Sequence, residues 1–236
     1  SSPVTAPAPA SAAESRRLHD LFDRQWDWAG LAFPEFATYR GDHRHGDRLA
    51  RFTPEAIAER DRMGRGFLDE ARAIHRDRLG AVDRVSLDMF IDNLERQQAL
   101  AAYPAARGMN LRALGGPQTQ FAELLQIMPV ATVAQVRQLL ARMEVAFPER
   151  MDDEIAQARR SAAAGWVPTR DVLQRVLAQI EPQLAADVEA TPFYAPLRRL
   201  GQAVGPQDRQ ALQARAREVI ATRVQPALRR LRALVT

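Results

Sequence analysis

The sequence contains no cysteine and no lysine. The absence of cysteine excludes disulfide scaffolds, cysteine-based zinc modules and enzymes that use a cysteine nucleophile. All 33 basic residues are arginine, which we interpret as the codon bias of a GC-rich genome. The formal net charge of +4 is therefore weak evidence for nucleic-acid binding.

Long apolar runs are also missing. No stretch of 18 or more apolar residues is present, which predicts no transmembrane segment, and the N-terminus lacks the pattern of an intact signal peptide. With 46% hydrophobic and 26% charged residues, the 236-residue chain has the composition of a globular protein. A chain of this length can bury roughly 70% of its unfolded surface in one core, so no second domain is required.

Residues 1–13 contain three prolines and no charged side chain, so we expect a disordered tether followed by one helical domain over residues 14–236. A neutral tether of this kind is common after a removed export signal. We therefore predict an exported protein, periplasmic or lipid-anchored. An ordinary disordered chain end has the same composition and remains an alternative.

The rest of the sequence has helical periodicity, with apolar residues spaced by three and four. Thr132 and Thr169 are expected to cap helices, Pro148 to break or kink one, and Gly165 to follow a helix end. No stretch alternates with the period of a strand. We predict an all-α, single-domain fold of about seven to nine helices, over roughly residues 14–33, 53–74, 83–102, 121–128, 132–147, 149–164, 169–180 and 206–236.

The last predicted helix ends at Thr236 without a glycine, asparagine or proline stop signal. This pattern is consistent with a chain cut from a longer protein and equally with a natural helical terminus.

Residues 198–236 carry nine arginines against two acidic residues. Such a basic helix can bind nucleic acid or an anionic membrane, or it can be a solvated face or pair with an acidic surface. No aromatic residue follows Tyr194, and the arginines are spread around the helix. We therefore predict no nucleic-acid partner.

The chain offers no complete catalytic or metal-binding set. None of its four histidines is followed by glutamate, so H-E-x-x-H is absent. His43 and His45, between Asp42 and Asp47, provide two imidazoles and two carboxylates, but spacing alone favours a polar cleft or surface loop over a metal site. We predict no catalytic residue and no metal ligand in this chain.

The polar segment between residues 33 and 49 is the strongest candidate for ligand contact. Four apolar residues bracket it and are expected to pin both ends to the core: Phe33, Phe36, Leu49 and Phe52. Its centre is too rich in ionisable groups to be buried at low cost. An arginine here can bind a substrate carboxylate in two-pronged geometry. The candidate substrate-binding residues are Tyr39, Arg40, Asp42, His43 and Arg48. The alternative is that Arg40 and Arg48 pair with Asp42 and Asp47 and only hold the loop's shape.

Nine short stretches carry a resemblance to a known family: Trp26–Ala29, Pro34–Asp42, Asp47–Leu49, Gly116–Pro117, Leu124–Pro129, Gly165–Arg170, Val176–Ile180, Thr191–Pro196 and Val224–Leu231. In their order and spacing they resemble the N-terminal part of the bacterial domain-of-unknown-function family 885. The resemblance spans about Leu18 to Thr236.

The resemblance implies the N-terminal portion of a larger helical fold. Longer members are exported or lipid-anchored and look like zinc peptidases, whose H-E-x-x-H motif, extended by Pro-Gly-His, comes after the point where this chain stops. It therefore implies that zinc belongs to a missing C-terminal half and that this chain alone is inactive. Residues 39–42 and 165–170 would then approach the cleft, with a peptide-like substrate and the remainder of the chain as partners. The alternative is a self-sufficient helical binding or structural module.

Overall fold

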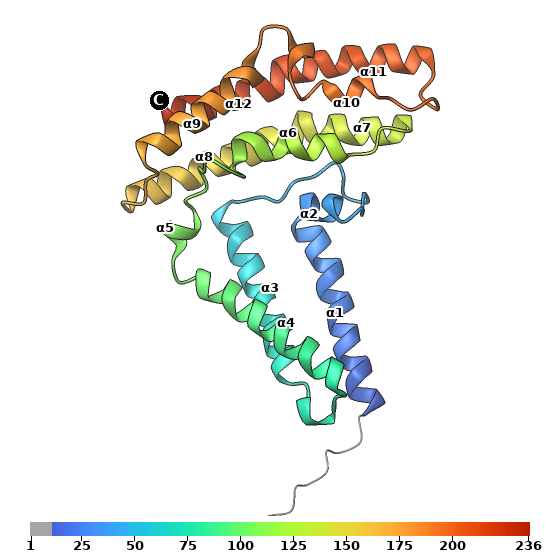
Figure 1. Cartoon of the computed structure of the whole chain (residues 1–236), viewed down its shortest axis with the longest axis vertical. Coiled ribbons are helices and arrows are strands. Elements are labelled where there is room, and N and C mark those ends of the chain that lie inside the picture. Colours follow the sequence, from blue (N-terminus) through green and yellow to red (C-terminus); the bar gives the residue numbers. More distant parts are fainter. Residues whose placement is uncertain (1–10) are drawn as a thin grey trace, which may run out of the picture. The chain divides into compact units, whose positions relative to one another are not determined.

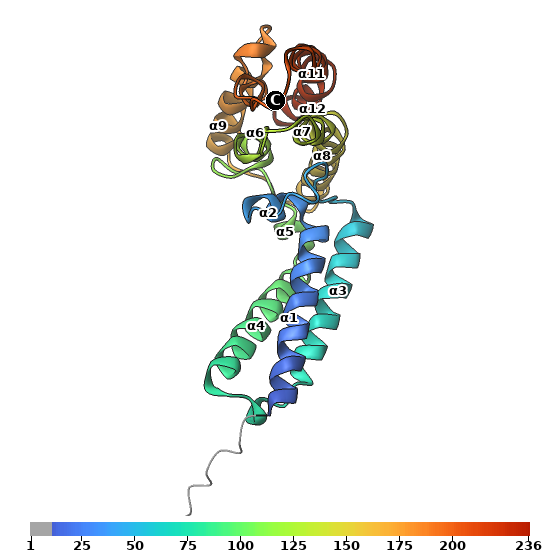
Figure 2. The same cartoon turned by 90° about the vertical axis from the view of Figure 1, so that its right-hand side faces the viewer.

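The computed structural model describes residues 11–236 (Figures 1 and 2). The first ten residues of the predicted tether lie outside the described residues. The described chain is helical and contains no strand, which confirms the all-α prediction. It divides into two compact units, one formed by residues 11–29 and 54–104 and the other by residues 30–53 and 105–236. Each unit has its own cluster of buried apolar side chains, where the sequence had suggested one core.

The first unit contains three long helices. Helix α1 (Ala12–Ala32) supplies residues up to Ala29, and α3 (Pro54–Arg72) joins α4 (Ala81–Leu100) through the short 3₁₀ helix η1 (Arg76–Arg78). The three long helices alternate in direction along the unit (Figure 2). Their core consists of Leu18, Leu21, Phe67, Leu68, Ala71, Ile74, Leu79, Leu87 and Leu94. Each helix begins within two residues of its predicted start.

The second unit contains two layers of helices (Figure 1). One layer holds α6 (Pro117–Ile127), α7 (Val133–Ala141) and α8 (Phe147–Ala163). The other holds α9 (Arg170–Ile180), α10 (Ala195–Arg198), α11 (Pro206–Val219) and α12 (Gln225–Val235). Between the layers, the rings of Phe121 and Phe147 stack at 4.2 Å, and Phe193 lies 6.2 Å from each.

Several short helices complete the chain: α2 (Pro34–Tyr39), α5 (Pro104–Arg107), η3 (Glu181–Leu184) and η4 (Val188–Ala190). None of these was predicted. Each has three to six residues, which is too short to display a helical period.

Two π-helical turns, η2 (Arg142–Ala146) and η5 (Ile220–Val224), interrupt the two longest helical runs and pack against each other. Each ends two residues before a proline, Pro148 or Pro226. A proline inside a helix lacks the N–H for the regular bond, and its ring clashes with the carbonyl four residues earlier. The wider π turn accommodates both defects. Pro148 was predicted to break or kink its helix; the helical run is not broken and continues through this turn.

Two of the predicted helix-end signals are confirmed. The Thr132 hydroxyl accepts from the Gln135 amide, and the Gln135 side chain accepts from the Thr132 amide, which forms a capping box at α7. Gly165 follows α8 at φ +84° in a Schellman motif, with the Trp166 amide bonded to the Ser161 carbonyl. Thr169 occupies the N-cap position of α9, but its side chain makes no cap hydrogen bond.

No helix in residues 11–236 has both the length and the apolar character required to cross a membrane.

Candidate functional site

The predicted polar segment begins as helix α2 and continues as an irregular loop from residue 40 to residue 53, all within the second unit. Pro34 stands at the start of α2, where its missing N–H costs nothing. Gly41, at φ +82°, ends the helix, and the Asp42 amide bonds back to the Ala37 carbonyl. The chain therefore turns sharply just before the charged residues.

Asp42 holds the first turn of the loop. It accepts the Arg44 backbone amide at 3.1 Å, and its two carboxylate oxygens accept the Arg44 guanidinium at 2.9 and 2.8 Å. These bonds to Arg44 keep the pKa of Asp42 well below its usual value of 3.8. The Asp42 carboxylate is therefore ionised at neutral pH.

Arg142 anchors the centre of the loop from inside the protein. It is fully buried in the π turn η2. Its Nε donates to the Arg48 carbonyl at 2.8 Å, and its two terminal nitrogens reach the Thr38 hydroxyl at 3.0 Å and the His45 carbonyl at 3.3 Å. One helical turn earlier, Gln138 donates to the His43 carbonyl at 3.1 Å. The loop backbone is thus held at three carbonyls by a single helical run.

The burial of Arg142 has an electrostatic cost. Desolvation lowers its pKa to about 10, while the carboxylates of Glu35 and Asp47 act in the opposite direction. No carboxylate within residues 11–236 forms an ion pair with the Arg142 guanidinium. Its hydrogen bonds go instead to backbone carbonyls, a hydroxyl and, at 3.4 Å, the Met128 sulfur. A buried cation with these partners gives the loop a defined shape.

Arg150, two helical turns after Arg142, anchors the end of the loop. It donates to Glu154 and to Glu35 at 2.7 Å each, and to the Ala50 carbonyl at 3.1 Å. Glu35 also accepts the Ala50 amide at 3.0 Å. The guanidinium lies 3.7 Å from the ring centre of Phe52. Both backbone groups of Ala50 are therefore satisfied by this pair, and Phe52 is held against the Arg150 guanidinium. Phe36, another expected anchor, is 59% exposed, so that part of the prediction is wrong.

Asp153 binds the next two residues of the loop, Arg51 and Phe52. Its carboxylate, on a residue that is 7% exposed, accepts two bonds from the Arg51 guanidinium at 2.8 and 3.0 Å. It also accepts the Phe52 amide at 2.8 Å. The hydrogen bonds that Arg51 donates to Asp153 raise the pKa of Arg51. The segment from residue 34 to residue 52 is consequently bound to α7, η2 and α8 at several points between Glu35 and Phe52.

The five candidate residues all lie on this anchored segment. Tyr39 and Arg40 lie at the end of α2 and are exposed; burial of part of the ring raises the pKa of Tyr39. His43 is half-buried, and its Nδ1 is a buried atom without a hydrogen-bond partner. Arg48 is exposed, with its guanidinium 3.5 Å from the Nδ1 of His45.

The alternative pairing expected inside the loop is wrong for Asp42. Its ion-pair partner is Arg44, and not Arg40 or Arg48. The physical reason is local. An aspartate side chain readily accepts the backbone amide two residues later, and this turn also places the Arg44 guanidinium beside the Asp42 carboxylate.

Sequence reasoning missed the anchoring residues Glu35, Gln138, Arg142, Arg150 and Asp153. One signal was available. Gln138 and Arg142 are four residues apart and interrupt an otherwise apolar helix face, where polar side chains need internal partners.

No group of three or more His, Asp or Glu side chains in residues 11–236 is arranged to hold a metal ion. His43 and His45 remain parts of the anchored loop.

The arginines of the C-terminal segment mostly bind groups of the second unit itself. Four of them form ion pairs with acidic residues: Arg215 with Glu144 and Glu218, Arg217 with Glu189, Arg230 with Asp152 and Arg232 with Glu181. Other arginines donate to backbone carbonyls, as Arg199 does to residues 125–128 and Arg209 to residues 200–204. The basic segment is therefore largely neutralised by its own surroundings.

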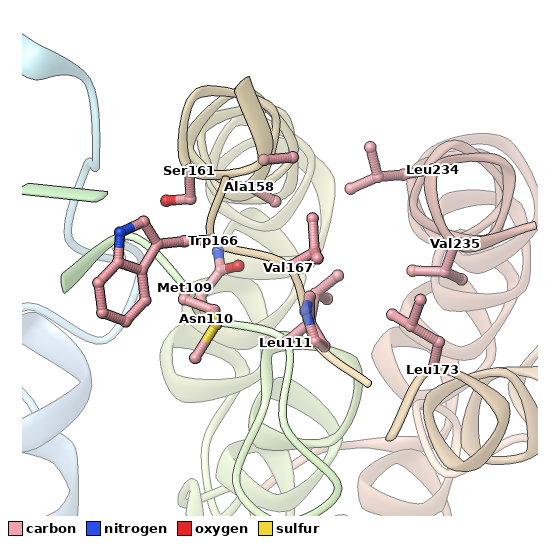
Figure 3. A pocket seen from close by; sticks show the side chains of 12 residues that line it. Met109, Asn110, Leu111, Ala158, Ser161, Trp166, Val167, Leu173, Leu234 and Val235 are labelled. Atoms are coloured by element: carbon pink, nitrogen blue, oxygen red, sulfur yellow. The ribbon is translucent and has the colours of Figure 1, made fainter. Parts of the chain in front are cut away.

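A second feature of the same unit is an apolar pocket of about 120 Å³ (Figure 3). Its walls come from the segment of residues 109–111, from α8, from the segment of residues 166–168 and from the last turn of α12. Trp166 and Val167 are exposed at its edge. One wall residue, Asn110, donates to Glu154, the partner of Arg150, so the pocket wall and the loop anchor share a hydrogen-bonded network.

The fold has a counterpart among solved structures. The crystal structure of a protein described as a putative lipoprotein from Colwellia psychrerythraea matches with a TM-score of 0.80 at 14% sequence identity. The match covers 94% of this chain and 41% of the lipoprotein, so the chain spans less than half the length of that structure. At this identity the likeness establishes the fold alone.

No curated protein matches the sequence. Residues 34–236 match the model of a bacterial protein family of unknown function, DUF885. The match covers most of the chain and includes the anchored loop and the pocket. The chain therefore belongs to the DUF885 family.

Proposed function

We propose that this chain is a non-catalytic helical part of a longer, exported, metal-dependent peptidase, and that residues 39–48 form part of its substrate cleft. The anchoring of the loop by buried Arg142 carries this proposal. Burying an arginine side chain costs desolvation free energy. Here the buried Arg142 guanidinium holds the backbone carbonyls of a loop whose charged side chains face outward. A rigid backbone that presents polar side chains suits ligand binding.

Arg48 is the residue best placed to bind a substrate. Its side chain is exposed, and Arg142 holds its backbone carbonyl in place. In this role it would bind a carboxylate of a peptide-like substrate in two-pronged geometry. Tyr39, Arg40, Asp42 and His43 would form the adjoining wall.

One comparison supports the part of the proposal that concerns export and a longer protein. The structural neighbour is described as a lipoprotein, a class of exported and lipid-anchored proteins, and it is more than twice as long as this chain. In a longer protein, the metal site and the water-activating groups would lie in sequence after Thr236. This chain would supply binding and orientation, with no catalytic group of its own.

The longer protein tests the proposal. We expect it to hydrolyse peptides and to lose this activity on chelation, whereas residues 1–236 alone should be inactive. Arg48→Ala should raise KM about 10- to 100-fold, the usual effect of losing a charged hydrogen bond, with an unchanged melting temperature. Arg137→Ala is the matched control, because Arg137 is an exposed arginine of the same unit outside the loop.

Absence of peptide hydrolysis by the longer protein, or equal effects of Arg48→Ala and Arg137→Ala, would contradict the proposal. The second candidate function is a self-sufficient helical binding module, which the apolar pocket beside Trp166 favours. Reading the coding sequence after Thr236 for H-E-x-x-H separates the two.

A further inference from the structure

We infer that the pocket beside Trp166 is a binding site for one aromatic ring, or a branched alkyl group of similar size, on an uncharged molecule that carries a hydrogen-bond donor. This inference does not depend on peptide hydrolysis by a longer protein. It rests on the pocket's size, on the chemistry of its walls and on one unpartnered atom.

The size of the pocket sets the size of the group. Its volume is about 120 Å³. Apolar cavities of roughly 150 Å³ bind benzene. A single ring, or a group the size of a leucine side chain, therefore fits, and a fused ring system does not.

The walls select an uncharged group. Leu111, Ala158, Leu173, Leu234 and Val235 provide apolar surface, and no lining residue is charged (Figure 3). An ion entering this pocket would lose its hydration without gaining a partner. The exposed indole of Trp166 lies at the edge, where it can cover a bound ring.

Asn110 is the reason why we expect the pocket to prefer a ligand with a hydrogen-bond donor. Its Nδ2 donates to the backbone carbonyl and the side chain of Glu154, which fixes the orientation of the carboxamide. Its Oδ1 is buried and has no hydrogen-bond partner. In Figure 3 this oxygen is turned towards Val167, across the pocket. A buried acceptor without a partner costs free energy, so a ligand that brings an O–H or N–H group gains affinity by satisfying it.

Phenol and toluene are matched probes, because they have the same number of heavy atoms and differ in one donor. The readout is the indole N–H signal of Trp166 in ¹H–¹⁵N spectra of the full 236-residue chain, identified by its loss in Trp166→Phe. The chain has three tryptophans, and Trp26 and Trp28 belong to the other unit, so their signals are internal controls. We expect phenol to shift the Trp166 signal with a Kd on the order of 1 mM, and toluene to bind about tenfold more weakly.

Ala158→Leu should fill the pocket and weaken phenol binding at least about tenfold. Ala163→Leu is the matched control, because Ala163 lies on the same helix and does not line the pocket. If Ala158→Leu fails to fold, Ala162→Leu narrows the pocket from its exposed edge. An unshifted Trp166 signal at about 10 mM phenol, or a shift that survives both pocket variants, would overturn the inference.

Two further results test whether the ligand's hydrogen-bond donor contributes to affinity, and whether the bound ring belongs to a peptide or to a free small molecule. Equal affinities for phenol and toluene would overturn the role of Asn110. N-acetyl-L-tyrosinamide carries the same phenol on a peptide backbone. Binding of both compounds supports a peptide side chain as the natural ligand, whereas binding of phenol alone supports a free small molecule.

Discussion

The two units of this protein place their charges differently. In the first unit, ion pairs such as Arg24–Glu70, Arg72–Glu95 and Arg76–Asp88 have both partners about half exposed. In the second unit, Arg142 is fully buried, and Glu154, the partner of Arg150, is 3% exposed. The first unit keeps these charges at its surface, whereas the second also buries charge to hold a loop.

This difference predicts which charged residues contribute most to the stability of the fold. Exposed ion pairs are screened by water and contribute little to stability. Removing one partner of a buried pair leaves an uncompensated charge in a poorly solvated place, and that is strongly destabilising. The following variants should distinguish the effects of buried charges from those of exposed ion pairs on stability.

Arg150→Met should have the largest effect, because it leaves Glu35 and Glu154 without their cation. We expect a loss of about 3–5 kcal/mol in the free energy of unfolding, measured by chemical denaturation. Adding Glu154→Gln to this variant should recover part of the loss, since it removes one of the uncompensated charges. A loss below about 1 kcal/mol would mean that the Arg150–Glu154 pair contributes no more to stability than an exposed ion pair does.

Arg142→Met should have a somewhat smaller effect. The carbonyls of His45 and Arg48 lose their donor, but the cost of burying the guanidinium is also removed. We expect a loss of about 2–3 kcal/mol in the free energy of unfolding. Because Arg142→Lys keeps the charge but cannot reach all three partners, a fully stable lysine variant would show that charge alone suffices.

Thr132→Ala should cost about 1 kcal/mol in the free energy of unfolding, since it removes the capping box of α7. Thr169 is its matched control, because it stands at the N-cap of α9 without a cap bond. Thr169→Ala should change stability by only a few tenths of a kcal/mol. Equal effects at the two positions would mean that the hydroxyl bond is not the cause.

Acidification should remove the contribution of Asp42. Because Arg44 lowers its folded-state pKa below 3.8, the Asp42 carboxylate stabilises the protein at pH values above the unfolded pKa. This contribution should decline as pH falls through the folded pKa. Unfolding curves of the parent and Asp42→Asn should therefore differ at pH 6 and converge towards about pH 2. A difference that grows on acidification would reverse the sign of this argument.

The smallest effect is expected at Arg76 in the first unit. Its pair with Asp88 has both side chains about half exposed. Arg76→Ala should change the free energy of unfolding by less than about 0.5 kcal/mol. A cost as large as that of Arg150→Met would remove the distinction between the units.

The long helices could be predicted from the sequence because their apolar spacing is a local property. Pro54 and Pro206 mark helix starts, and Gly165 marks a helix end, each through its own backbone chemistry. The division into two cores could not be predicted in this way. Leu87 and Leu140 have the same helical pattern, and only the tertiary fold assigns them to different clusters.

The candidate loop was located correctly in sequence, since its charge and glycine content are local features. Its anchors could not be identified, because Arg142 is about a hundred residues away from the carbonyls that it binds. The large number of arginines also makes these anchors hard to recognise, since the spacing of Gln138 and Arg142 is the one local feature that separates the buried Arg142 from exposed arginines such as Arg137. The role of the five candidate residues in substrate binding stays a prediction.

Hydrogen exchange of the loop amides tests most directly the claim that Arg142 gives residues 38–48 a fixed shape. In the parent chain, the amides of Asp42, Gly46 and Arg48 should be protected, because each donates to a backbone carbonyl. In Arg142→Met, we predict that these amides exchange much faster, while those of α3 and α4 keep their protection. Rapid exchange of the loop in the parent, or unchanged protection in the variant, would contradict the account.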